Sequence, residues 1–169
     1  MDSQSLRNST LAPGWRPDEV AVLKVALMKY GIGRWKKIMQ SGFLPGKTPS
    51  QLSSQTQRLL GQQSLAEYLH LHLDIDMTAA YNAKRTGVKR KSNCIINTGN
   101  NPDPKELERL REFNQERFGL TAAQINELAI PRISTLSRKL SVQGDSITRL
   151  EQLYSLKEHV EQKLRKLKK

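Results

Sequence analysis

The sequence predicts an all-α protein in which a three-helix module comes first and a helical docking region follows. Two tryptophans, Trp15 and Trp35, frame a segment whose apolar residues recur at spacings of three and four, which is typical of amphipathic helices. Several polar capping residues are followed three positions later by Glu or Gln, which marks helix starts. The alternating pattern expected of half-buried strands is almost absent.

The first two helices of the module are predicted from their ends. Pro17 suits the first position of a helix, and Gly31 is expected to stop that helix in a left-handed cap. A short second helix is expected between Gly33 and Gly42. Its inner face would carry Trp35, Ile38 and Met39.

The third helix has the clearest start. Thr48 is the expected N-cap, Pro49 the first helical residue and Gln51 the partner in a capping box. Gly61 is expected to end it. The predicted inner residues are Leu52, Thr56 and Leu59, and the predicted outward residues are Ser50, Ser53, Ser54, Gln57 and Arg58.

Further helices are expected along the rest of the chain. Ser64 and Glu67 predict a fourth helix that carries Leu65, Tyr68, Leu69 and Leu73. Asp103 is expected to cap a helix that Gly119 ends, and a capping box at Thr121 starts another that Pro131 breaks. A last helix is expected from Ser146 toward Leu167, with a heptad seam of Leu150, Leu153, Val160, Leu164 and Leu167.

These elements predict four regions. We expect a disordered N-terminus at 1–13, a helical domain at 14–83, a basic linker and docking loop at 84–102, and a helical partner-binding region at 103–169. The seam of the last helix needs a cover, which either the helices at 104–128 or a groove on another protein would provide.

Composition limits the possible partners and sites. The net charge of +12 favours an anionic partner, either nucleic acid or a membrane surface. A single cysteine, Cys94, excludes a disulfide within the chain and a cysteine-rich zinc site. No stretch reaches the length of a membrane span and no signal peptide opens the chain, so we expect a soluble intracellular protein with no membrane contact. His70 and His72 lie near Asp74 and Asp76, where we favour a helix terminus or irregular turn over a metal site.

Two sets of residues are candidates for contact with DNA. On the third helix, Ser and Gln side chains can read base edges, and Gln suits adenine. Phosphate contacts would come from Arg34, Lys36, Lys37, Lys47 and Arg58. The alternative is a solvated polar face. The second set is a basic run that would be a phosphate-contacting arm, a nuclear localisation signal or a solvated linker: Lys84, Arg85, Lys89, Arg90 and Lys91.

The tryptophan-framed segment resembles the Myb/SANT and homeodomain-like helix-turn-helix family. The resemblance implies a third helix that lies in the major groove of DNA, as in Myb repeats, or a face that binds proteins, as in SANT modules. Myb repeats carry a third tryptophan where this chain has Thr56. The matching residues are Trp15, Leu23, Leu27, Tyr30, Gly31, Trp35, Ile38, Lys47, Thr48 and Leu52.

Four stretches resemble a narrower group, the smaller homeobox-like DNA-binding accessory subunits of ciliate DNA adenine methyltransferase complexes. These stretches are residues 33–38, 44–47, 58–65 and 93–99, and the likeness spans roughly Leu11 to Ile130. It implies an assembly of a catalytic methyltransferase subunit, a degenerate methyltransferase-like partner and two small DNA-binding subunits. Such an assembly uses S-adenosylmethionine to form 6-methyladenine in DNA.

The chain itself carries no methyltransferase motif. It has neither a glycine-rich loop after a strand nor an Asp-Pro-Pro-aromatic tetrad. We therefore expect a nuclear, non-catalytic DNA-binding subunit without a cofactor of its own, with S-adenosylmethionine on the catalytic partner. Docking would involve Cys94, Ile95, Ile96 and the seam of the last helix. The alternative is a SANT-type protein-interaction module of a chromatin or transcription complex.

Overall fold

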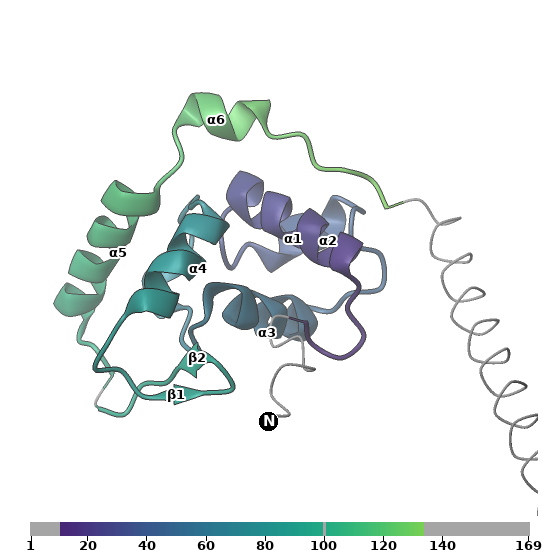
Figure 1. Cartoon of the computed structure of the whole chain (residues 1–169). Helices are drawn as coiled ribbons and strands as arrows, with labels where there is room; N and C mark the ends of the chain where they lie inside the picture. Colours follow the sequence, from purple (N-terminus) through teal and green to yellow (C-terminus); the bar gives the residue numbers. More distant parts are fainter. Residues whose placement is uncertain (1–10, 100, 134–169) are drawn as a thin grey trace, which may run out of the picture. The chain divides into compact units, whose positions relative to one another are not determined.

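The computed structural model describes residues 11–99 and 101–133, and in this part of the chain the regular structure is helical except for one two-stranded hairpin (Figure 1). The predicted all-α class is confirmed. Helices α1 (Pro17–Tyr30), α2 (Trp35–Gln40) and α3 (Pro49–Leu60) form the three-helix module. The remaining elements are η2 (Ala66–Tyr68), α4 (Ile75–Lys84), the strands β1 (Arg90–Lys91) and β2 (Cys94–Ile95), α5 (Pro104–Phe118) and α6 (Ala122–Glu127).

Helix α3 begins and ends where the capping signals predict. The Thr48 hydroxyl accepts a hydrogen bond from the Gln51 amide at 3.3 Å, and the Gln51 side chain accepts one from the Thr48 amide at 2.9 Å. Gly61 ends the helix with φ 65° and ψ 31°, a left-handed conformation that glycine adopts without steric cost. Both ends of α3 are therefore determined locally.

The core of the module lies between these three helices. Fully buried leucine and isoleucine side chains come from α1, α2 and α3 and include Leu23, Leu27, Ile38 and Leu52. Thr56 is buried among them, and its hydroxyl donates to the Leu52 carbonyl at 2.7 Å. A threonine is tolerated at this core position because its one polar atom is satisfied.

The predicted inner face of α2 is only partly correct. Ile38 is fully buried, but Met39 is 41% exposed and Trp35 is partly exposed. The physical reason is the length of α2, which has six residues and therefore fewer than two turns. So short a helix buries little more than one side chain completely.

The predicted helix over 64–73 is wrong. Only a single 3₁₀ turn forms there, and His70 then takes a positive φ of 71°. The segment bonds to other parts of the chain instead: the His70 amide donates to the Ile32 carbonyl at 2.7 Å, and the Ile32 amide donates to the Leu71 carbonyl at 3.0 Å. These tertiary hydrogen bonds replace the ladder that a continuous helix would have formed.

Helix α4 is an element that the sequence reasoning missed. Asp74 caps it by accepting a hydrogen bond from the Met77 amide at 2.8 Å. Its buried residues, Ile75, Thr78 and Asn82, recur at spacings of three and four. These two signals together would have found α4, but two of the three buried residues are polar and hide the apolar stripe.

Helices α5 and α6 start at the predicted caps, Asp103 and Thr121. They do not form a region apart from the first domain, because residues 104–132 belong to the same compact unit as the three-helix module. The Asp74 amide donates to the Phe118 carbonyl at 2.9 Å, and the Leu120 amide donates to the His72 carbonyl at 2.8 Å. Residues up to 132 therefore pack with the first domain, and the partner-binding role of 103–169 stays a prediction.

Two predicted regions fall wholly or largely outside the described residues. The seam of the last helix, from Leu150 to Leu167, lies there, and so do residues 1–10 of the predicted disordered N-terminus. Of that terminus the structure describes 11–13, where the Ala12 amide donates to the Gln55 side chain at 2.9 Å. In the described part of the chain, none of the helices combines the length and apolar character needed to span a bilayer.

The two tryptophans are expected to differ in their contribution to stability. Trp15 is 6% exposed, so Trp15→Ala should lower the free energy of unfolding by about 3–5 kcal/mol. Trp35→Ala should cost roughly 1–2 kcal/mol, because part of that ring is already in contact with water. Urea denaturation followed by circular dichroism measures both, and an equal or larger loss for Trp35→Ala would contradict the burial described here.

Candidate nucleic-acid interface

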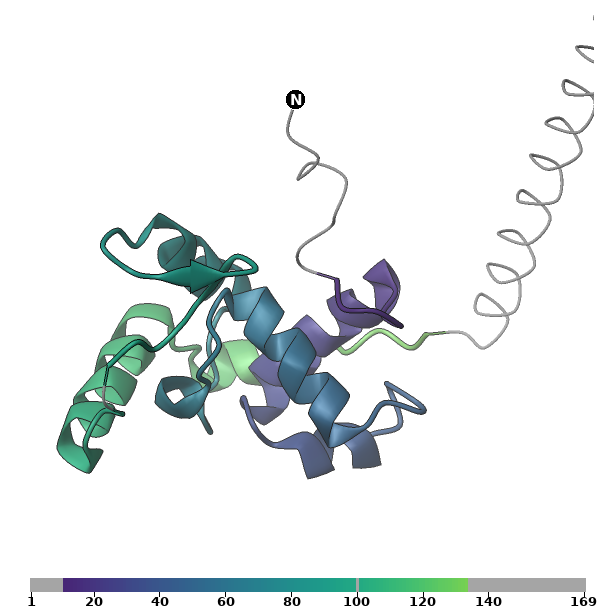
Figure 2. The same cartoon turned by 90° about the horizontal axis from the view of Figure 1, so that it is seen from below.

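The outward face of α3 is the candidate recognition surface. Figure 2 shows α3 crossing the near face of the module, with the β1–β2 hairpin beside one end of it. Ser50 and Ser54 are exposed, as predicted, whereas Ser53, Gln57 and Arg58 are half-buried. Gln57 is partly engaged within the chain, because its side-chain amide donates to the Gln63 carbonyl at 2.6 Å.

Charge is segregated along the described chain. Residues 20–66, which contain α2 and α3, include seven Lys or Arg residues and no Asp or Glu. Residues 77–102, which contain the hairpin, include five Lys or Arg residues and again no acid. Helix α5 carries four residues of each sign. Two of the seven cations in the first stretch, Lys24 and Lys47, are paired with Asp76 and Glu19, so the others are the ones that a polyanionic partner could contact.

Three of the predicted phosphate contacts lie on the surface. Arg34, Lys36 and Lys37 are all exposed at the start of α2. Because residues at the start of a short helix share one end of the module, these three cations are placed together. They remain predictions of DNA contact.

The prediction that Lys47 contacts a phosphate is corrected, because the Lys47 side chain is buried in the core. Its ammonium group lies 2.7 Å from the Glu19 carboxylate, and the two side chains are only 5% and 4% exposed. The same group donates to the Gly14 carbonyl at 2.7 Å and lies 4.5 Å from the centre of the Trp15 ring. A lysine held by a carboxylate, a carbonyl and an aromatic face is part of the core.

The hairpin lies against the carboxyl end of α3. Its two-residue turn, Ser92–Asn93, has positive φ at both positions, 50° and 63°, as tight hairpins of the right twist require. The Ile95 amide donates to the Gly61 carbonyl at 2.8 Å, and the Gln63 amide donates to the Ile95 carbonyl at 2.9 Å. These bonds join β2 to the residues that directly follow α3.

The predicted partner contact at Ile95 is also corrected. Ile95 is 7% exposed, because its side chain packs against the domain that carries the hairpin. Its neighbours Cys94 and Ile96 are half-buried. Burial raises the pKa of the Cys94 thiol, and the positive charges of Arg58 and Arg90 offset part of that shift. A thiol with a raised pKa is a poor nucleophile at neutral pH.

Two arginines of the predicted basic arm are held within the chain. The Arg90 guanidinium donates to the carbonyls of Asn82, Ala83 and Arg85 at the end of α4, at 2.5, 3.4 and 3.2 Å. Arg85 donates to the Gln62 side chain at 3.5 Å. The remaining cations of that run, Lys84, Lys89 and Lys91, are exposed. The run is thus a folded part of the domain.

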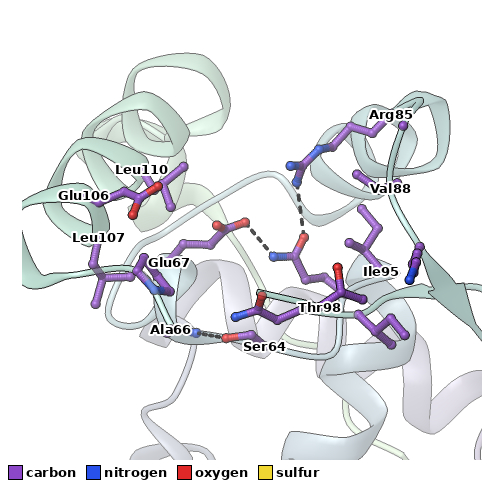
Figure 3. A pocket seen from close by; sticks show the side chains of 16 residues that line it. Ser64, Ala66, Glu67, Arg85, Val88, Ile95, Thr98, Glu106, Leu107 and Leu110 are labelled. Carbon is purple, nitrogen blue, oxygen red and sulfur yellow. Dashed lines mark hydrogen bonds between the residues drawn. The ribbon is translucent and has the colours of Figure 1, made fainter. Parts of the chain in front are cut away.

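A buried polar network fixes α4 and η2 against the end of α3. The Asn82 side-chain amide donates to the Leu60 carbonyl at 2.9 Å and to the Tyr68 hydroxyl at 3.0 Å, and that hydroxyl donates to the Gln62 side-chain oxygen at 3.2 Å. Gln62 in turn donates to Glu67 at 2.8 Å, at the edge of a cleft of about 400 Å³ between the hairpin and α5 (Figure 3). Burial raises the pKa of the Tyr68 hydroxyl, and the nearby Glu67 charge adds to the shift.

The His and Asp residues between η2 and α4 serve the fold. Asp74 caps α4, His72 Nδ1 lies 2.9 Å from the Met28 carbonyl, and Asp76 pairs with Lys24. Their side chains are engaged with different partners, in agreement with the favoured helix terminus. Among the residues that the structure describes, no group of three or more His, Cys, Asp or Glu side chains is placed to hold a metal ion.

Comparison with known proteins finds a similarity for the first part of the chain. Residues 13–60, from the N-terminal segment through α3, match the Myb-like DNA-binding domain. No curated protein and no solved structure matches the chain. Residues 13–60 are therefore similar to the Myb-like DNA-binding domain, and α4, the hairpin, α5 and α6 lie outside the matched residues.

The buried pair of Glu19 and Lys47 generates a prediction about stability. Lys47→Ala should lower the free energy of unfolding by about 3–5 kcal/mol, because it leaves the Glu19 charge buried without its partner. The double change Glu19→Leu with Lys47→Met should recover most of this loss. Lys36→Ala, an exposed control, should stay within about 0.5 kcal/mol of the parent protein. A Lys47→Ala protein that unfolds at the parent's urea concentration would contradict the buried pair.

Proposed function

We propose that this protein binds duplex DNA through the face formed by α2 and α3. The observation that carries this proposal is the similarity of residues 13–60 to the Myb-like DNA-binding domain, together with the seven Lys or Arg and the absence of Asp and Glu in residues 20–66. The exposed cations at the start of α2 contact phosphates and set the position of the domain on the duplex. The polar residues on the outward face of α3 then lie against the major groove.

We further propose that the chain is a non-catalytic accessory subunit of a DNA adenine methyltransferase complex in the nucleus. The support is the resemblance of residues 33–38, 44–47, 58–65 and 93–99 to the small DNA-binding subunits of such complexes. In this role the chain raises the affinity of the complex for DNA. The catalytic partner holds S-adenosylmethionine, and a degenerate methyltransferase-like subunit and a second small DNA-binding subunit complete the assembly.

Removal of two phosphate contacts tests the DNA-binding face. Lys36→Ala with Lys37→Ala should weaken binding to a 20-base-pair duplex and lower the slope of log affinity against log salt by about 1.8, since each lost phosphate contact lowers it by roughly 0.9. The matched control is Lys105→Ala with Arg109→Ala, which removes the same charge from exposed positions on α5. Fluorescence anisotropy across a salt series measures both.

Equal behaviour of the two double variants would exclude the α2 cations from the interface. A chain that binds no duplex at low salt, yet captures defined chromatin proteins through the same face, would favour the SANT-type protein-interaction module.

Reconstitution tests the accessory role. The isolated chain should neither bind S-adenosylmethionine nor methylate DNA, because it lacks the motifs for both. Added to the catalytic and degenerate subunits, it should raise the rate of adenine methylation when DNA is limiting, and little when DNA is saturating. Isothermal titration calorimetry and incorporation of labelled methyl groups measure these outcomes. An unchanged rate at limiting DNA would remove the accessory role and leave DNA binding intact.

A further inference from the structure

The hairpin and α3 share one surface. A cleft of about 300 Å³ lies between them and is lined by Ser54, Gln57 and Arg58 of α3 and by Lys91 and Ser92 of the hairpin. A second cleft, of about 350 Å³, again includes Arg58, with Arg90, Ser92 and Asn93. Residues that line one open cleft are accessible to the same partner at the same time.

Strand alternation directs Lys91 toward the α3 side of the hairpin. Lys91 is paired with Cys94 in the β1–β2 register, so both side chains are on the same face. The Cys94 sulfur lies 3.6 Å from the Gln57 carbonyl of α3, which shows that this face turns to the helix. Arg90 lies on the opposite face and holds the end of α4. The register therefore places Arg90 on the face that bonds to the end of α4 and the exposed Lys91 on the face that turns to α3.

The charge around these clefts is of one sign. Among the described residues that line them there are three Lys or Arg side chains, Arg58, Arg90 and Lys91, and none of Asp or Glu. They surround the carboxyl end of α3, where the helix dipole is negative and repels a phosphate. The backbone carbonyls at that end are covered, because Asn82 bonds to Leu60 and Ile95 bonds to Gly61. Arg90 and Lys91 of the hairpin thus place positive charge at a helix end whose dipole would otherwise repel a phosphate.

The hairpin position is also rigid. Two backbone hydrogen bonds join β2 to residues 61–63, the buried Ile95 side chain anchors it, and Arg90 holds β1 to the end of α4. The hairpin backbone therefore loses little conformational freedom on binding, which favours affinity.

We infer that the hairpin, residues 88–96, is a second DNA-contacting element, a wing, which binds the phosphate backbone bordering the groove that α3 occupies. Lys91 and Arg58 make the phosphate contacts. This inference rests on the proposed DNA binding through α2 and α3 and adds a separate contact region beyond the Myb-like residues 13–60. The wing extends the footprint on one side of the groove and carries no sequence information itself, because it contacts backbone and not base edges.

The test uses the full chain and a 20-base-pair fluorescent duplex. Lys91→Gln should weaken binding roughly threefold to tenfold and lower the salt slope by about 0.9, the value for one phosphate contact. Lys91→Arg, which keeps the charge, should retain most of the parent affinity. The control is Lys105→Gln, which removes one exposed charge from α5 and should match the parent protein. Hydroxyl-radical footprinting should show that Lys91→Gln loses protection at one border of the site only.

The outcomes separate this inference from the proposed function. If Lys91→Gln and Lys105→Gln behave alike while Lys36→Ala with Lys37→Ala weakens binding, the wing is wrong and DNA binding through α2 and α3 stands. If the parent chain itself binds no duplex, the proposed function fails and the wing fails with it. A Lys91→Gln footprint that shrinks evenly at both borders would also overturn the wing, because the loss would then be one of general attraction.

Discussion

The buried ion pair between Glu19 and Lys47 sets the position of α3, the helix on which the rest of the structure depends. Lys47 directly precedes the N-cap of α3, and Glu19 lies in the first turn of α1. The Glu19 carboxylate also accepts a hydrogen bond from the Arg16 amide at 3.1 Å, so one carboxylate caps α1 and holds Lys47. Removal of either charge would destabilise the fold, because the other charge would then be buried without a partner in a medium of low dielectric constant. The pair therefore fixes where the chain enters α3.

The other end of α3 is held by a different kind of interaction. There the Asn82 side chain donates a hydrogen bond to the Leu60 carbonyl, and the Ile95 amide donates one to the Gly61 carbonyl. These bonds replace those that a further turn of helix would have supplied. Asn82 comes from α4 and Ile95 from the hairpin, so two elements outside residues 13–60 complete the carboxyl end of the helix. Polar anchors at both ends leave the outward face of α3 presented in one orientation. Binding benefits, since little freedom remains to be lost on contact.

The charge distribution follows the same division. The exposed cations at the start of α2 and on the hairpin stand in stretches of sequence without acids, whereas the charges of α5 balance one another. Helix α5 instead contributes hydrogen bonds that secure η2: Arg111 donates to the Ala66 carbonyl at 3.0 Å, and Asn114 donates to the Glu67 carbonyl at 3.3 Å. The stretches of sequence without acids thus lie in and beside α3, and α5 holds η2 in place. The proposed function uses the first, and α5 keeps η2 in position at the buried polar network.

The sequence by itself determined the elements whose ends are local. Thr48, Pro49, Gln51 and Gly61 marked both ends of α3, because capping hydrogen bonds and a left-handed glycine involve only neighbouring residues. Asp103 and Thr121 marked the starts of α5 and α6 for the same reason. The spacing of the tryptophans and apolar residues also indicated a Myb-like module, and the match at 13–60 supports this. Such a spacing can be seen in the sequence because it involves residues that are close along the chain.

Only the tertiary structure decided which polar residues are core and which are surface. Lys47 looked like a phosphate contact because sequence spacing carries no information about a carboxylate 28 positions away. Residues 64–73 carried helix signals, yet their backbone groups form hydrogen bonds with Ile32 and Leu120, which are remote in sequence. Lys91 and Arg58 were separate candidates until the register and the buried Ile95 placed them at one cleft. In each case the deciding hydrogen bond or ion pair joins distant parts of the chain, so local pattern could not reveal it.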